Sequence, residues 1–577
     1  MQQNKANKFN EELGGIIKNT ENVKTKIEEV MELFTFKKQL SVFDTLKKHG
    51  HEVSKLLGVL VLLPFYGVDN IYNMIKSGIT FENKDAYYDV KNNENIDWRM
   101  LLVLFAKRFG SLINKRDTLK KHGITALIGD DSPFHKAGKM MENISMVHDH
   151  VTNNFILGYK ILVIGYWDGG SFIPIDFSIH REKGNKLQKS KDALKSAKKS
   201  IQSTIGKLNK AKASYQKKQK ANQRHRLKVK ENPTNTNINN LEKSMASCQK
   251  AKDKVSSLKK ELSNKESYQR VLKEEHSRVA KKFPEYGLSR KEKNQQFRKN
   301  RNVDSFGYIR SKEADTSKTK TFITMVKRAV KNGFIPDYVL TDSWFFCLEL
   351  LQAIDKLASK GVRLLSMVKK GNAAYTLLPN GKTYNAQALL KLHERKASYS
   401  RKLKAWYIRI PVTYSGIRIN LFFVKMGKKG TWRLLATNDL NLGFVKMMEV
   451  YQIRWSIEVF FKESKQYLNL GKSSSSDFDG QIADATLSMI QHIMLTFFKR
   501  MNYQQSFGEL FKAISSEMVE SSLAEKLWEI FLQVIKELGE VLKLDIFEIH
   551  EQALRNDKAM LFMKQLIFQK SELKNAA

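Results

Sequence analysis

The stretch from Tyr451 to Lys465 has the most restrictive residue pattern in the chain. It contains no Pro or Gly, and its apolar residues recur three and four positions apart, which predicts one continuous helix. At ~100° per residue, five polar residues share an arc of about 80°: Tyr451, Arg454, Glu458, Lys462 and Lys465. A separate arc carries the apolar residues Ile453, Ile457, Phe460 and Phe461. Such a helix can bury one face while the other presents a carboxylate beside three cations.

The charged face has two interpretations. A single Glu–Lys pair at four-residue spacing is commonly an ordinary surface ion pair. Here Glu458 faces three cations, and folding alone does not require that excess of positive charge. A polyanion lying across the face, with a metal ion on Glu458, would explain it.

The spacing of this face also matches a known motif. Tyr-x2-Arg-x3-Glu-x6-Lys is filled by Tyr451, Arg454, Glu458 and Lys465. This spacing resembles the YREK signature of bacterial insertion-sequence transposases of the DDE type. Trp455 and Lys462 also stand at positions that the cut-and-paste members of that family fill with similar residues. The resemblance implies an α/β protein with a ribonuclease-H-like catalytic core.

We expect five residues of this stretch to contact DNA: Tyr451, Arg454, Trp455, Lys462 and Lys465. The polar ones would bind phosphate beside the active site, where Arg454 can hold two oxygens at once. Trp455 would either stack on DNA or pack against the protein.

Net charge indicates the partner. The 577 residues include 100 Lys and Arg against 59 Asp and Glu, a formal charge of +41. Such an excess repels itself in the folded state unless a polyanion offsets it, which favours nucleic acid. The resemblance implies that this partner is double-stranded DNA. An anionic membrane is the competing partner, but the sequence has no lipidation motif, and its most apolar run, Leu56 to Val68, is too short to span a bilayer. The two cysteines, Cys248 and Cys347, indicate a reducing cytoplasm.

Shifts in pattern divide the chain into segments. From the N-terminus we expect a helical region that binds DNA ends, the first part of the core, a lysine-rich helical hairpin, the second part of the core, a β-rich insertion, the catalytic helix with the end of the core, and a helical C-terminal region. Their bounds are 1–120, 121–180, 181–300, 301–370, 371–440, 441–502 and 503–577. The end-binding role of the first segment is implied by the resemblance alone.

The segment 181–300 is strongly basic and has helical periodicity. It holds 35 Lys and Arg against 11 Asp and Glu, an excess of 24. Apolar residues spaced mostly three or four apart predict one helical arm over 187–215 and another over 241–262. Residues 231–240 between them are rich in helix breakers. We expect an antiparallel hairpin, which is either a solvated charged arm or a contact for flanking or target DNA.

Three acidic residues stand at comparable predicted positions. Asp130 follows a predicted strand that begins at Ile124, Asp342 follows another over 337–341, and Glu458 lies on the helix described above. In transposases of this class three acids follow in the order Asp, Asp, Glu. Carboxylates at strand ends can share one crevice and hold two Mg²⁺ ions, or Mn²⁺ in their place. Two such ions ~4 Å apart suit the in-line displacement of a phosphodiester.

Each aspartate also has a purely structural interpretation. Asp342 precedes a Ser and could cap a helix, and Asp130-Asp131-Ser132 could form a turn. In the family, the first acid precedes a Ser or Thr by two residues, which favours Asp130. Asp131 remains the alternative.

Other side chains could add to the site. Trp406 and Trp432 lie in the β-rich insertion, where they either pack in a core or stack on a flipped base. Four histidines lie near Asp130 in sequence: His122, His135, His148 and His150. His148-Asp149-His150 could bind zinc, but no second ligand pair accompanies it, so loop histidines are the better interpretation.

The resemblance implies a cytoplasmic, nucleoid-associated bacterial transposase. Such an enzyme binds inverted-repeat ends, cuts DNA with Mg²⁺ and joins the 3′ ends to target DNA, working as a homodimer in a synaptic complex. One alternative is a non-catalytic DNA-binding relative. Another is a nuclease of the same fold that uses water and performs no strand transfer.

Overall fold

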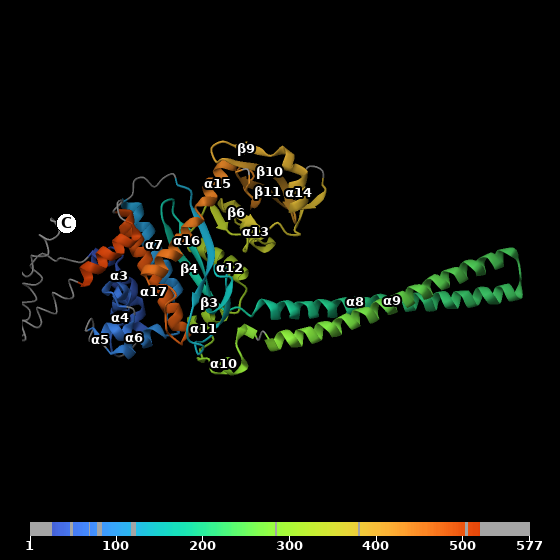
Figure 1. Cartoon of the computed structure of the whole chain (residues 1–577), viewed down its shortest axis with the longest axis horizontal. Coiled ribbons are helices and arrows are strands. Elements are labelled where there is room, and N and C mark those ends of the chain that lie inside the picture. The colour runs from blue at the N-terminus through green and yellow to red at the C-terminus, as the bar shows by residue number, and fades with distance from the viewer. Residues whose placement is uncertain are drawn as a thin grey trace, which may run out of the picture. The chain divides into compact units, whose positions relative to one another are not determined.

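The computed structural model describes residues 26–46, 50–68, 70–77, 83–116, 123–282, 285–378, 381–427, 429–501 and 506–519. The chain divides into two compact units (Figure 1). The first comprises Met1–Phe134, Ile161–His180 and Arg298–Ala577, and the second comprises His135–Lys160 and Arg181–Phe297. Most of the predicted C-terminal region 503–577 and the first part of the N-terminal region lie outside the described residues.

Short helices make up the described N-terminal part of the first unit. They are α2 (Lys26–Leu33), α3 (Phe36–Leu40), α4 (Val53–Leu62), α5 (Ile71–Lys76), α6 (Lys84–Lys91) and α7 (Trp98–Arg116), with 3₁₀ turns at Ser41–Leu46 and Leu63–Tyr66. Gly50, with a φ of 90°, lies between the first 3₁₀ turn and α4. Apolar residues recur three and four positions apart over 98–113, and these residues fall within α7.

These helices pack on α17 (Phe478–Met501), whose side chains are buried on nearly all sides. The ring of Phe497 on α17 lies 5.5 Å from that of Phe34 and 6.2 Å from that of Phe109, measured between centroids. Edge-on aromatic contacts of this kind stabilise a core beyond the area that they bury.

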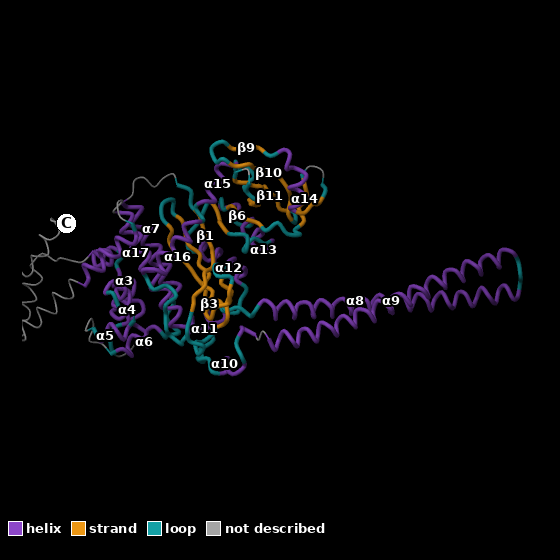
Figure 2. The backbone as a smooth tube through the Cα atoms, in the orientation of Figure 1, coloured by secondary structure: helices purple, strands orange, loops and turns teal. Residues whose placement is uncertain are grey.

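A mixed sheet runs through the first unit (Figure 2). Its core strands are β1 (Ala126–His135), β3 (Asn154–Trp167), β4 (Phe172–His180), β5 (Tyr338–Thr341) and β6 (Arg363–Val368). They are hydrogen-bonded in the order β4-β3-β1-β5-β6, and β1, β5 and β6 are parallel. Residues 126–129, 339–341 and 364–366 are buried, as expected for parallel strands covered on both faces.

The β-rich segment extends the same sheet. It contains β7 (Ala374–Leu377), β8 (Thr383–Asn385), β9 (Ser398–Ser400), β10 (Ala405–Tyr414), β11 (Ile417–Met426) and β12 (Arg433–Thr437). β12 pairs antiparallel with β6, and β11, β10, β7 and β8 follow in that order. This β-rich segment also contains a helix, which the sequence did not predict. Asn385 caps a helix, α14 (Ala386–His393), by accepting a hydrogen bond from the backbone N–H of Ala388.

The stretch from Tyr451 to Lys465 is two helices and not one. α15 (Phe444–Gln452) ends before Arg454, and α16 (Trp455–Tyr467) begins after it. Between them, the N–H of Ile453 donates to the carbonyl of Val450, and the N–H of Arg454 to that of Tyr451. Such bonds over three residues tighten the turn, although both residues keep right-handed helical dihedral angles. Ile457, Phe460 and Phe461 are buried as the apolar arc predicts.

The first unit also contains α11 (Phe306–Glu313), α12 (Lys318–Lys331) and α13 (Leu348–Asp355). α12 lies against β1, where the ring of Phe322 covers Gly129 so closely that a Cβ atom there would lie 2.1 Å from it. The fully buried Phe322 thus requires a glycine directly before Asp130.

A buried charge cluster joins α7, α11 and α12 to β4. The Asp176 carboxylate on β4 lies 2.8 Å from Arg99 Nε and 2.7 Å from Arg328 Nη2. Arg310 Nη1 is 3.7 Å away. Burial alone would raise the pKa of Asp176, but the three guanidinium groups outweigh it and the pKa is lowered.

The second unit contains β2 (Ser145–Asp149), which the sequence did not predict, and three helices: α8 (Asn185–Glu231), α9 (Asn235–Lys282) and α10 (Arg290–Asn294). β2 pairs antiparallel with the first residues of β3. α8 and α9 lie side by side, joined at Asn232 by the predicted helix-breaking segment, although α9 begins within it (Figure 1). Their facing residues recur three and four positions apart, as in a two-stranded coiled coil.

Candidate active site

The parallel pairing of β1 and β5 brings two of the three predicted acids together. Gly129 on β1 stands opposite Thr341 on β5. The next residue of each strand is therefore also a neighbour of the other: Asp130 and Asp342 follow at the same level, on strands ~4.8 Å apart. Burial raises the pKa of Asp130 to about 7, and the like charge of Asp342 adds to that rise.

Arg454 links this pair to the third acid. Its Nη1 lies 3.1 Å from Asp130 Oδ2, and its Nη2 donates to Glu458 Oε1 one helical turn along the chain. Burial opposes the charged guanidinium, but Tyr451, Glu458 and Asp130 outweigh it, so the pKa of Arg454 is raised. The tight turn between α15 and α16 places Arg454 where it can contact both carboxylates.

Tyr451 and Lys465 fasten α15 and α16 to the strand ends. The Tyr451 hydroxyl donates to the carbonyl oxygen of Thr341 at 3.2 Å. Burial raises the pKa of Tyr451 to about 12. Lys465 Nζ donates to Ser132 Oγ at 2.7 Å and to the carbonyl of Pro133 at 2.9 Å. Both side chains thus have protein partners beside the acids.

The structure separates the two candidates for the first acid. Asp131 follows Asp130 on β1, and successive strand residues point to opposite faces. The Asp131 carboxylate forms an ion pair with Lys318 of α12, whereas Asp130 faces Arg454. The Asp131 N–H also donates to Asp130 Oδ1 at 2.8 Å, which helps to fix that carboxylate.

Asp342 does not cap a helix. α13 begins six residues later, and its N-terminal capping residue is Cys347. Instead, Asp342 Oδ1 accepts a hydrogen bond from the N–H of Trp344 at 2.9 Å. This local turn holds the carboxylate at the end of β5.

Solvent-facing residues surround the acids. Trp455 is 62% exposed, and Lys462 is also exposed, so both predicted DNA contacts are accessible. Trp344 is 50% exposed, with Lys369 Nζ 4.1 Å and Lys318 Nζ 5.7 Å from its ring centroid. Sequence reasoning missed Trp344 and its lysines. The only local signal was an aromatic residue two positions after Asp342, because the lysines come from other elements.

The other predicted site residues form contacts of their own. Trp406 on β10 packs against Tyr399 with ring centroids 5.0 Å apart, and Trp432 donates from Nε1 to Glu394 at 3.0 Å. Neither tryptophan is buried in the core. His148 and His150 have their Nδ1 atoms 3.2 Å apart, while His122 lies outside the described residues.

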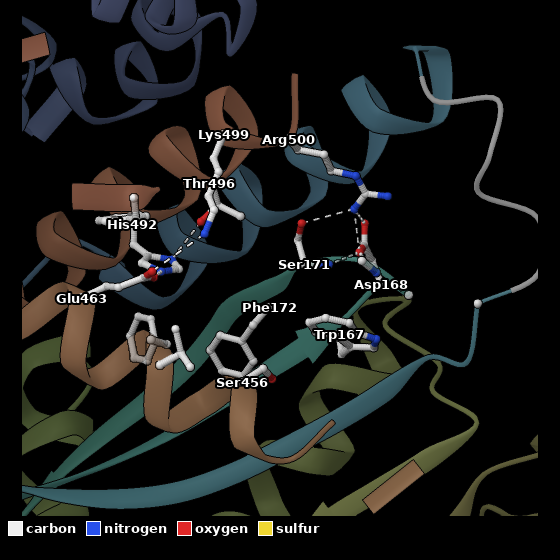
Figure 3. Close-up of a pocket in the computed structure, with 16 residues that line it drawn as sticks. Trp167, Asp168, Ser171, Phe172, Ser456, Glu463, His492, Thr496, Lys499 and Arg500 are labelled. Atoms are coloured by element: carbon white, nitrogen blue, oxygen red, sulfur yellow. Dashed lines mark hydrogen bonds and ion pairs between the residues drawn. The ribbon is translucent and has the colours of Figure 1, made fainter. Parts of the chain in front are cut away.

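A pocket on another part of α16 contains none of the three acids. This pocket has a volume of about 630 Å³, and its walls include Phe172, Ser456, Phe460 and His492 (Figure 3). Its ionisable side chains lie close to one another in pairs. Arg500 Nη1 lies 2.8 Å from Asp168 Oδ2, and His492 Nε2 lies 3.4 Å from Glu463 Oε2. Burial lowers the pKa of His492.

Comparison with protein families gives a match to part of the chain. Residues 305–494 match the family model described as Transposase DDE domain. The matched range is about a third of the 577 residues and includes Asp342 and Glu458 but not Asp130. No curated protein matches the chain. The match supports a DDE transposase and implies a ribonuclease-H-like core for the mixed α/β fold.

The three acids differ in how readily they could bind a divalent metal. Neighbouring carboxylates on β1 and β5 provide the oxygen donors that Mg²⁺ prefers, and a cation beside them would relieve the repulsion that raises the pKa of Asp130. Glu458 is engaged by Arg454, and in the described part of the chain no group of three or more His, Cys, Asp or Glu side chains is already arranged around one metal position. Asp130 and Asp342 therefore fit a metal directly, and Glu458 fits once it leaves Arg454.

The described helices include none that combines the length and apolar character needed to cross a bilayer.

Proposed function

We propose that this protein is a DNA transposase that binds inverted-repeat ends, cleaves phosphodiester bonds and joins the 3′ ends to target DNA. The observation that carries the proposal is the pairing of Asp130 with Asp342 at the ends of two parallel strands, with Arg454 connecting Asp130 to Glu458. The match of residues 305–494 to a transposase domain supports the same reaction class.

Asp130, Asp342 and Glu458 would hold two Mg²⁺ ions, for which Mn²⁺ can substitute. Bound ions of this type activate an attacking oxygen and stabilise the departing one. Arg454 balances the charge of two carboxylates in the structure, and its planar fork suits two oxygens of a DNA phosphate when DNA is present. Trp455 and Lys462 contact DNA from their exposed positions.

Tyr451 and Lys465 have a positioning role in this proposal. Their polar atoms bind the strand ends at Thr341 and Ser132, so they hold α15 and α16 at a fixed distance from the acids. A phosphate contact for either residue requires that these bonds be exchanged. We also propose a homodimer that joins two DNA ends, and a cytoplasmic location on the nucleoid.

Alanine variants test the catalytic assignment. Asp130→Ala, Asp342→Ala and Glu458→Ala should each reduce Mg²⁺-dependent cleavage of DNA to background, because each removes a metal ligand. The substrate is a supercoiled plasmid that carries the DNA bordering the protein's own gene. Binding to the same DNA should change little. Asp131→Ala is the matched control, since it removes an adjacent carboxylate that faces Lys318, and it should keep cleavage.

Three outcomes would overturn the proposal. Cleavage retained by Asp342→Ala would remove that residue from the chemistry. If cleavage occurs but a pre-cleaved end is never joined to a second DNA, the protein is a nuclease without strand transfer. DNA binding without any cleavage by the intact protein would instead indicate a non-catalytic relative.

A further inference from the structure

The hairpin formed by α8 and α9 has an uneven distribution of charge along its length. The half that contains the turn, residues 207–260, holds 16 Lys and Arg against 3 Asp and Glu. The other half, residues 185–206 and 261–282, holds 12 against 5. We call these the distal and proximal halves. The positive excess is therefore nearly twice as large in the distal half, 13 against 7.

The seam between the two helices does not account for this charge. Its most buried members are small or neutral: Thr204, Leu208, Ala211, Cys248 and Ala251. In the proximal half, acidic residues flank the seam on α9 at 261, 266 and 275. In ordinary coiled coils, such flanking positions pair opposite charges across the helices.

The flanks of the distal half carry no acid at all. The flanking positions of α8 and α9 there include Lys207, Lys212, Arg226, Lys252, Lys254 and Lys259. Its acids, Glu231, Glu242 and Asp253, point away from the seam by their heptad position. Like charges on both sides of a narrow seam destabilise the pairing of the helices. The charge pattern of the distal half thus opposes the fold of the hairpin.

A bound polyanion would offset the repulsion between these like charges and so stabilise the pairing of the helices. We propose that the distal half of the α8–α9 hairpin binds the sugar–phosphate backbone of duplex DNA without reading its sequence, at a surface separate from the three acids. The distal part of each helix is ~38 Å long at 1.5 Å per residue, which matches the length of roughly 11 base pairs. Lysines lie on the outward sides of both helices there, where they can contact phosphates.

Charge removal in the full-length protein tests this surface. Lys210, Lys217 and Lys220 are exposed and lie outside the seam, and Gln has nearly the helix propensity of Lys. The triple variant K210Q/K217Q/K220Q should bind a 40-base-pair duplex at least tenfold more weakly at low salt. The slope of log affinity against log salt concentration should fall by up to about 3, since each lost phosphate contact contributes ~0.9.

Two matched variants test separately whether DNA binding depends on the positive charge of the lysines and on their position in the hairpin. K210R/K217R/K220R keeps the charge and should bind like the unaltered protein. K189Q/K195Q/K199Q removes three exposed lysines of the proximal half and should leave the slope unchanged. Circular dichroism should show the same helix content in all of them. Binding is measured without divalent ions, so the result does not depend on cleavage.

The proposal is overturned if the distal Gln variant binds the duplex with unchanged affinity and slope, or if the proximal variant loses as much. It is also overturned if the distal variant loses binding only to phosphatidylserine vesicles, because the partner would then be a membrane. If Asp342→Ala loses cleavage but binds the duplex fully, this inference still stands. Failure of the duplex-binding inference can therefore be distinguished from failure of the proposed function.

Discussion

At the scale of single residues, the site depends on how the repulsion between neighbouring carboxylates is offset. Asp130 and Asp342 are neighbours because their strands are parallel and in register, and the fold supplies one guanidinium, that of Arg454, for Asp130 and Glu458 together. The carboxylates are therefore held in an arrangement that a divalent cation would stabilise further.

The raised pKa of Asp130 predicts how stability depends on pH. Its folded pKa of about 7 exceeds the ordinary value of 3.8, so the folded protein binds this proton more tightly than the unfolded chain does. Without divalent ions, the free energy of unfolding should fall as pH rises from about 4 to 7. At higher pH this carboxyl group should cause no further change. Asp130→Asn should remove that part of the decline in thermal melts. An unchanged pH profile in Asp130→Asn would contradict the burial argument, and Asp89→Asn, at an exposed position, is the control.

Asp176 makes a second residue-scale prediction. Asp176→Ala would remove one of two carboxylates shared by Arg99, Arg310 and Arg328, and only Glu313 would remain beside them. Removing one partner from a buried charge group costs roughly 3–5 kcal/mol, so we expect a large drop in the free energy of unfolding by urea. Since the pKa of Asp176 is lowered, the loss should be largest above its ordinary pKa and should shrink in acid. A change below about 0.5 kcal/mol, as for an exposed site, would refute this role.

At the scale of elements, local periodicity predicts helices well and their breaks poorly. The spacing of apolar residues predicts α7 and both arms of the hairpin because each helix buries one stripe. The break between α15 and α16 left no trace in the sequence, since it contains no Gly or Pro and keeps helical dihedral angles. α14 was missed because the residues on either side of it form strands.

Gly129 connects the packing of α12 against β1 with the position of Asp130. A Cβ atom at this position would lie 2.1 Å from the ring of Phe322, so Gly129→Ala must push α12 away from β1. Overpacking of this kind costs typically ~1–3 kcal/mol, and we expect cleavage to fall as well, because Asp130 is the next residue. Gly110→Ala is the matched control. It lies in α7 with no heavy atom near its Cβ, and it should stabilise the protein by ~0.5–1 kcal/mol. Equal melting temperatures for the two variants would contradict the contact.

At the scale of the whole molecule, the site depends on pairing between distant segments. The strand ends that carry Asp130 and Asp342 are separated in sequence by the entire hairpin, and β12 joins β6 to extend the sheet. The predicted strand ends placed Asp130 and Asp342 correctly beside each other, and the four-residue spacing placed Arg454 beside Glu458. The joint catalytic role of the three acids stays a prediction. The ion pair of Arg454 with Asp130 could not be predicted, since it arises only from tertiary contact.

The central claim is that Asp130, Asp342 and Glu458 act together as a metal site. The most direct measurement is a crystal structure of the protein with Mn²⁺ and a DNA end, in which anomalous scattering locates the metal. We predict anomalous peaks between the carboxylates of Asp130 and Asp342 with Glu458 turned from Arg454 toward the metal, and no such peaks in Asp342→Asn. Peaks that lie only elsewhere, with Arg454 still bound to Asp130 and Glu458 in the presence of DNA, would contradict the claim.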